Sequence, residues 1–137
     1  MGKLLKRAGS FLKTAELRLK WGDYDLACLD AEQALQLYLK AVLLELFGFP
    51  TRTHGILEHL SLLRRELSTT QHSSLAEELS SLVKEKRAII DLLDESYIEG
   101  RYGLAEGYTK ELAEQAIKTA RQVINLLEKI REKVRRA

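Results

Sequence analysis

The sequence predicts an all-α protein, an antiparallel up-and-down four-helix bundle with an additional shorter helix, and two observations support this. Apolar residues make up 45% of the 137 residues and recur at spacings of three and four over long segments, as amphipathic helices require. The chain has a single proline, and its glycines and polar residues separate these segments by short loops. We expect residues 1–137 to form one domain.

The first two helices are expected at residues 2–21 and 24–47. Gly22 ends the first, and Asp23 is the expected N-cap of the second. The second helix carries a stripe of small and apolar side chains that should face inward: Tyr24, Ala27, Cys28, Ala31, Ala34, Leu35, Tyr38 and Val42. Gln33 lies beside this stripe, where it either sets the register between helices or marks a self-association surface.

The shorter helix is expected at residues 54–67. Gly48 supplies a stop for the preceding helix, and Pro50 prevents its continuation. Thr53 is then the expected N-cap of the shorter helix.

Two further long helices complete the bundle. One follows an apolar stripe from Leu75 to Tyr97. The last begins after Thr109, a good N-cap, with Glu111 in its first turn, and runs to about Arg135.

The composition excludes several classes of protein. The longest apolar run, residues 41–49, is interrupted by Glu45 and is too short to span a bilayer. The basic amino terminus lacks the apolar core of a secretory signal, so we expect a cytoplasmic protein with no membrane contact. The lone Cys28 is expected to be a buried, unreactive thiol.

The net charge of +2 conceals an asymmetry along the chain. Residues 1–20 hold six Lys or Arg against one Glu, and residues 118–137 hold seven against two, so each end carries +5. Two basic terminal helices packed side by side would form a cationic face that attracts phosphate or an acidic partner. The alternative is a pair of solvated helix faces.

Familiar catalytic motifs are absent from the sequence. Neither common glycine-rich phosphate loop is present, so we expect no cofactor. The histidines, His54, His59 and His72, lack the spacing of a metal site, and we expect no metal. His54 or His59 could act as a general base, but for His54 the alternative is a role in capping the shorter helix.

The segment from Tyr97 to Tyr108 interrupts the helical pattern. It holds three glycines, three tyrosines and one arginine in twelve residues. Arg101, beside the first turn of the last helix, suits a phosphate or carboxylate, with Tyr102, Tyr108 and His54 as neighbouring ligand contacts. The alternative is that Arg101 pairs internally with Glu99, Asp94 or Glu106.

Several of these motifs together resemble the HEPN domain of archaea and bacteria. The resemblance covers nearly the whole chain and rests on Tyr24-Asp25-Leu26-Ala27, Ala31-Glu32-Gln33-Ala34-Leu35, Thr53-His54-Gly55-Ile56 and Glu99-Gly100-Arg101-Tyr102. It implies a helical bundle, commonly a homodimer, often encoded beside a small nucleotidyltransferase in a toxin–antitoxin-like pair. Active members of the family carry Arg, four to six residues, then His, and cut RNA without a metal.

This chain departs from that motif. After Arg101, the positions where the histidine would stand hold Glu106, Gly107 and Tyr108. We therefore expect a binding module that works with a nucleotidyltransferase partner and holds a nucleotide or RNA phosphate near Arg101, rather than an enzyme. The alternatives are a metal-independent ribonuclease toxin that uses Arg101 with Glu106 or His54, and a purely structural dimer.

Overall fold

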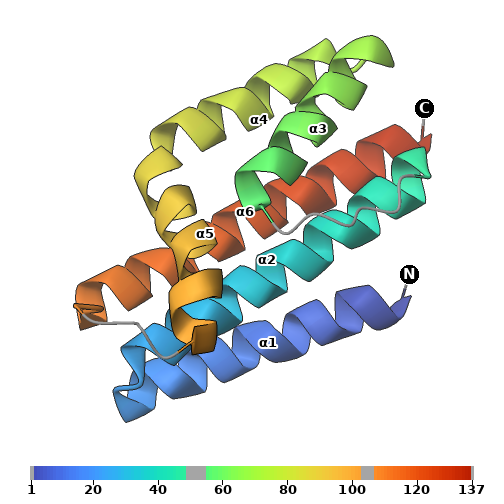
Figure 1. Cartoon of the computed structure of the whole chain (residues 1–137). Helices are drawn as coiled ribbons and strands as arrows, with labels where there is room; N and C mark the ends of the chain where they lie inside the picture. The colour runs from blue at the N-terminus through green and yellow to red at the C-terminus, as the bar shows by residue number, and fades with distance from the viewer. Residues whose placement is uncertain (1, 49–54, 103–106, 137) are drawn as a thin grey trace.

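The computed structural model describes residues 2–48, 55–102 and 107–136, and for residues 97–102 only the backbone. Within these ranges the chain forms six helices and no strand, so the predicted all-α class is confirmed (Figure 1). The helices are α1 (Gly2–Trp21), α2 (Tyr24–Phe47), α3 (Ile56–Thr69), α4 (Ser73–Glu85), α5 (Arg87–Tyr102) and α6 (Lys110–Arg136).

The central helix is α2, which contacts α1, α3, α5 and α6. Its buried face is rich in alanine, and small side chains let neighbouring helices approach closely. The predicted inward residues are buried except Tyr24, which is partly exposed: Ala27, Cys28, Ala31, Ala34, Leu35, Tyr38 and Val42. The stripe predicted from the sequence therefore marks the core of the protein.

The three longest helices, α1, α2 and α6, pack side by side (Figure 1). α1 and α2 run in opposite directions, as expected for an up-and-down pair, whereas α2 and α6 run in the same direction. An ion pair joins the last turns of these two helices, Glu45 on α2 and Arg131 on α6. Both chain termini consequently lie at the same end of the molecule.

The helix expected along residues 75–97 is in fact two helices, and this prediction was wrong. α4 ends at Glu85, and α5 begins at Arg87 in a new direction (Figure 1). Lys86 still donates its N–H to the Leu82 carbonyl at 2.9 Å and accepts the Ile90 N–H at 2.9 Å. The turn keeps these local hydrogen bonds and contains no glycine or proline, so periodicity alone gave no sign of it. It lets α4 pack on α3 while α5 packs on α2.

Two further predictions from the sequence concern the lone cysteine and a membrane span. Cys28 is buried, and burial together with the nearby Asp25 charge raises the pKa of its thiol to about 12, so it stays protonated. None of the helices in the described part of the chain is long and apolar enough to cross a membrane.

Candidate functional site

The arginine singled out from the sequence lies at the end of α5. Arg101 and Tyr102 are the last two residues of this helix, and residues 97–102 are helical. The expectation that the helical pattern stops at Tyr97 is thus corrected, because α5 continues for more than one further turn. A glycine inside a helix costs only about 1 kcal/mol relative to alanine, which a helix packed on its neighbours tolerates. The side chains of Arg101 and Tyr102 lie outside the described residues.

Two other predicted site residues also lie outside the described part of the chain. His54, the expected ligand contact and alternative base, falls in residues 49–54, and Glu106 falls in residues 103–106. Their relation to Arg101 therefore remains a prediction.

The third predicted contact, Tyr108, is half-buried and packs against the hydrophobic core. Its hydroxyl lies 3.2 Å from the Ser96 hydroxyl, which is itself 2.9 Å from the Leu92 carbonyl oxygen. Ser96 is one turn before the last turn of α5, so this contact holds α5 against the residue that leads into α6. The preceding Gly107 has a φ of 81°, a conformation that glycine adopts without strain.

The start of α6 follows the sequence prediction. Thr109 accepts the Leu112 backbone N–H on its side-chain oxygen at 3.2 Å, as an N-cap does. Asp23 precedes α2 as expected but makes no such bond; its carboxylate lies 3.8 Å from the Arg18 guanidinium instead.

The N-terminus of α3 is capped from another helix rather than from its own sequence. α3 begins at Ile56, so the predicted start at residue 54 with Thr53 as cap is wrong. Asp94 of α5 accepts the Ile56 backbone N–H at 2.6 Å and the Leu57 N–H at 3.3 Å. A carboxylate is favoured at this position because it meets unpaired N–H groups and the positive end of the helix dipole. No pattern along the sequence pairs residues that lie 37 and 38 positions apart.

A buried carboxyl group on α2 lies close enough to Asp94 to be affected by its charge. Glu32 is fully buried, and its Oε1 atom accepts a hydrogen bond from the Gln33 side chain at 2.7 Å. Burial raises the pKa of Glu32 to about 7; the amides of Gln33 and Gln36 oppose this, and the Asp94 charge adds to it. The sequence had drawn attention to Gln33, whereas the enclosed polar residues on α2 are Glu32 and Gln36.

His59 on α3 is also buried and is 1% exposed. His59 was one of two possible general bases, but neither it nor Glu32 can reach an RNA strand while the helices stay packed. Both side chains therefore belong to the core of the protein and not to an accessible site. No three His, Cys, Asp or Glu side chains in the described residues come together as a metal site would need.

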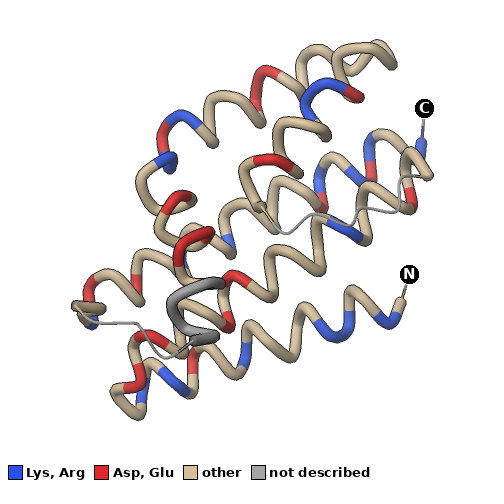
Figure 2. Tube along the Cα trace, viewed as in Figure 1, with Lys and Arg blue, Asp and Glu red and all other residues tan. Residues whose placement is uncertain are grey.

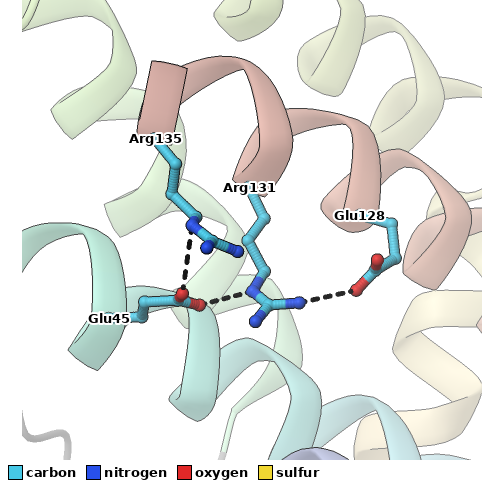
Figure 3. A network of polar contacts seen from close by, with 4 residues as sticks. All are labelled: Glu45, Glu128, Arg131 and Arg135. Carbon is cyan, nitrogen blue, oxygen red and sulfur yellow. Dashed lines mark hydrogen bonds and ion pairs between the residues drawn. The ribbon is translucent and has the colours of Figure 1, made fainter. Parts of the chain in front are cut away.

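The basic residues at the two ends of the chain differ in how many of them form ion pairs. On α6, Arg131 and Arg135 both pair with Glu45, and Arg131 also pairs with Glu128 at 3.3 Å (Figure 3). Arg136 pairs with Glu132 at 2.8 Å. Hence much of the positive charge at the end of α6 is neutralised within the protein.

The positive charge of α1 is mostly not neutralised. α1 does contact α6, through Arg121 and Glu16 at 2.8 Å, so the two basic helices lie side by side as expected. The other basic residues of α1, apart from Arg18, have no acidic partner among the described residues: Lys3, Lys6, Arg7, Lys13 and Lys20. The unpaired positive charge of the cationic face predicted from the sequence therefore lies more on α1 than at the end of α6.

One surface hollow lies where α1 ends and α6 begins. It is lined by Glu16, Leu17, Leu19, Lys20, Tyr24 and Lys110. The last turn of α5, which holds Arg101, points toward this same end of the molecule (Figure 1). Two lysines, a tyrosine and the helix carrying Arg101 therefore share one end of the bundle.

Comparison with known proteins identifies the family. The sequence matches the HEPN domain over residues 1–130. The chain belongs to the HEPN domain family. This HEPN chain is also similar to TT1696 from Thermus thermophilus, whose crystal structure superimposes with a TM-score of 0.69 at 28% sequence identity, over 93% of this chain and 94% of that one. No curated protein sequence matches it.

Proposed function

We propose that this HEPN chain is a binding module that holds an anionic ligand, a nucleotide or an RNA phosphate, at the end of the bundle that bears Arg101. The observation that carries the proposal is the family match across residues 1–130 combined with the residues after Arg101. Glutamate, glycine and tyrosine occupy positions 106–108, where cleaving members place their histidine. An arginine alone binds phosphate through its planar fork of N–H donors, but it has no partner for proton transfer.

The surroundings of α5 support an anion at this end. The Ser96–Tyr108 contact holds α5 beside the start of α6, and Lys20 and Lys110 add positive charge nearby. Tyr102, Tyr108 and His54 are the proposed neighbouring contacts of the ligand. Glu106 stands where cleaving members have their histidine, and an anion beside a scissile phosphate disfavours cleavage.

The family also suggests how the module is used. We propose that residues 1–137 act as a single cytoplasmic domain, that the chain forms a homodimer, and that it works with a nucleotidyltransferase partner in a toxin–antitoxin-like pair. Native co-purification tests the partner directly. Recovery of a nucleotidyltransferase would support the paired system, whereas recovery of the homodimer alone would contradict it.

Ligand binding is tested by calorimetric titration of the purified chain with ATP and with a short single-stranded RNA. Arg101→Ala should weaken binding about tenfold or more, because a charge-assisted hydrogen bond to phosphate contributes roughly 1.5–3 kcal/mol. Arg87→Ala is the matched control, because Arg87 lies at the other end of α5 and pairs with Asp91 on the surface. Equal binding by wild type and Arg101→Ala would remove Arg101 from the site.

The same preparation separates the rival functions. RNA cleavage in EDTA that is lost in both Arg101→Ala and Glu106→Gln would show a ribonuclease in place of a binding module. A chain that binds neither ATP, RNA nor a nucleotidyltransferase, yet remains dimeric, would fit the purely structural role.

A further inference from the structure

The outward face of α1 carries positive charge along its whole length. Lys3, Lys6, Arg7, Lys13 and Lys20, with Trp21 at the end, form what we call the α1 outer face, and all six side chains are exposed. Their spacings of three, four and seven residues place them on one side of the helix. By the rise of an α-helix, the lysines span about 26 Å.

Nothing in the described chain covers this face. α1 packs only against α2 and α6, through a side that includes the buried Ala8 and Ala15 (Figure 1). Its one acidic residue, Glu16, is turned toward Arg121 of α6. Figure 2 shows the blue segments along α1 with one red segment, the single acid of this helix, among them; that acid pairs with α6 and so does not neutralise the cations of the outer face.

Apolar exposure on α1 is confined to one end. Trp21 is 63% exposed and Leu17 is 47% exposed, one turn apart in the C-terminal part of the helix. A partner helix would need an apolar stripe along the full face, and a membrane-surface helix would need many more apolar side chains. A row of cations with a single flat aromatic ring is instead the combination that binds single-stranded nucleic acid, through phosphates and one stacked base.

We propose that the α1 outer face binds single-stranded nucleic acid, with the cations contacting successive phosphates and the Trp21 indole stacking on a base. Lys20 and Trp21 lie at the same end of the bundle as the last turn of α5, whereas Lys3, Lys6, Arg7 and Lys13 extend away from that end along α1. The proposal does not depend on the function proposed for Arg101. A strand lying on it would run along the outside of α1 and end at the turn into α2.

The test uses the fluorescence of Trp21, which is the only tryptophan of the chain and so reports on the C-terminal end of this face. Titration with a short oligouridylate should quench the emission and saturate. If all five cations contact phosphates, the log–log dependence of the binding constant on salt has a slope of about −3.5. The Lys6→Glu and Lys13→Glu double variant should weaken binding at least about tenfold and reduce the slope to about −2.

A matched control changes the same charge elsewhere. Arg65 on α3 and Lys84 on α4 are exposed and have no acidic partner in the described residues. The Arg65→Glu and Lys84→Glu double variant should retain most of the affinity, and Arg101→Ala should leave the quenching of Trp21 unchanged. Trp21→Phe, followed by anisotropy of a labelled strand, should retain binding, whereas Trp21→Ala should weaken it about tenfold.

Three results would overturn the proposal. The first is RNA binding without any change in Trp21 emission. The second is equal weakening by the α1 and control double variants, which would indicate a general charge effect. The third is a blue shift of Trp21 with anionic lipid vesicles but no response to oligouridylate, which would make this face a membrane contact.

Discussion

At the scale of single residues, the most unusual group is the carboxyl of Glu32, which is buried between helices with no ion pair to a described cation. Its Oε1 atom instead accepts a hydrogen bond from the Gln33 amide at 2.7 Å. A buried carboxyl group without a counter-charge stays protonated to a higher pH, and its pKa is raised to about 7. The protein should therefore lose stability as this group is forced to ionise.

The pH dependence can be predicted with its sign. Below about pH 4.5 Glu32 is protonated in both the folded and the unfolded chain. Between pH 4.5 and about 7 the unfolded chain ionises first, so the free energy of unfolding falls, by an amount on the order of 3 kcal/mol. Above about pH 7 the loss is complete.

Glu32→Gln should remove this loss, because an amide is neutral at every pH and still accepts the Gln33 hydrogen bond. Urea unfolding at pH 5 and pH 8 measures the effect: the variant should be more stable than wild type at pH 8 and similar to it at pH 5. Glu77→Gln is the control, because Glu77 is exposed. If the stability gain of Glu32→Gln over wild type is no larger at pH 8 than at pH 5, the pKa of Glu32 is not raised.

A second residue-scale prediction concerns the cap of α3. Asp94→Ala leaves the Ile56 and Leu57 N–H groups without an acceptor and should lower the free energy of unfolding by about 1–2 kcal/mol. Asp94→Asn should lose less, since it keeps one acceptor oxygen. Asp91→Ala on the exposed side of α5 is the control, and equal losses at Asp91 and Asp94 would show that the cap contributes nothing.

At the scale of helices, the contact between α2 and α6 joins two elements that are far apart in the sequence. The pair is held by apolar side chains along most of its length and, at one end, by Glu45 of α2 with Arg131 and Arg135 of α6 (Figure 3). The hydrogen bond that Arg131 donates to Glu45 raises the pKa of Arg131, and the charge of Glu45 adds to this, so the guanidinium stays charged at any ordinary pH. The side chains of Glu45 and Arg131 are about four-fifths buried, so water screens them less than a surface pair.

Glu45→Gln should therefore lower the free energy of unfolding by more than the loss of an ordinary surface ion pair does. We expect a decrease of about 1–2 kcal/mol in the free energy of unfolding, because two guanidinium groups are left facing each other with one carboxylate fewer. Glu132→Gln removes an exposed pair from the same helix and should cost no more than about 0.5 kcal/mol. Thermal melts at low and high salt would measure the loss of stability in each variant. Equal losses in Glu45→Gln and Glu132→Gln would argue against a stabilising role for the buried network.

At the scale of the whole molecule, α2 lies at the centre of the contacts. α1, α3, α5 and α6 all pack on it, whereas α4 packs mainly on α3 and buries few of its residues. Local opening is cheapest where few apolar contacts are lost. The structure thus predicts a graded stability across the molecule.

Native-state hydrogen exchange should show this gradient. Amides in the middle of α2 should exchange only through global unfolding, while those of α4 should exchange through smaller openings, with protection lower by about 2 kcal/mol or more. Peptide-resolved mass spectrometry at several denaturant concentrations measures both. Equal protection in α2 and α4 would show instead that the six helices open as one unit.

Much of this organisation could be predicted from the sequence. The inward stripe of α2, the Thr109 cap and the buried Cys28 all follow from spacing and side-chain chemistry that act within a few residues. The break at Lys86 was missed because its local hydrogen bonds are helical, and the cap of α3 was assigned to Thr53 because the true cap lies on another helix. The buried Glu32 was missed because a polar residue beside an apolar stripe has the same local sequence whether it is enclosed or exposed.

The sequence by itself thus determined the all-α class, the inward faces of the helices and membership of the HEPN family, since these depend on periodicity and on motifs along the chain. Only the tertiary structure decided that α2 and α6 run side by side, that Asp94 caps α3, and that the charge of α6 is largely paired while that of α1 is not. The physical reason is that hydrogen bonds and ion pairs act over a few ångströms in space. Which residues come that close depends on how the helices pack.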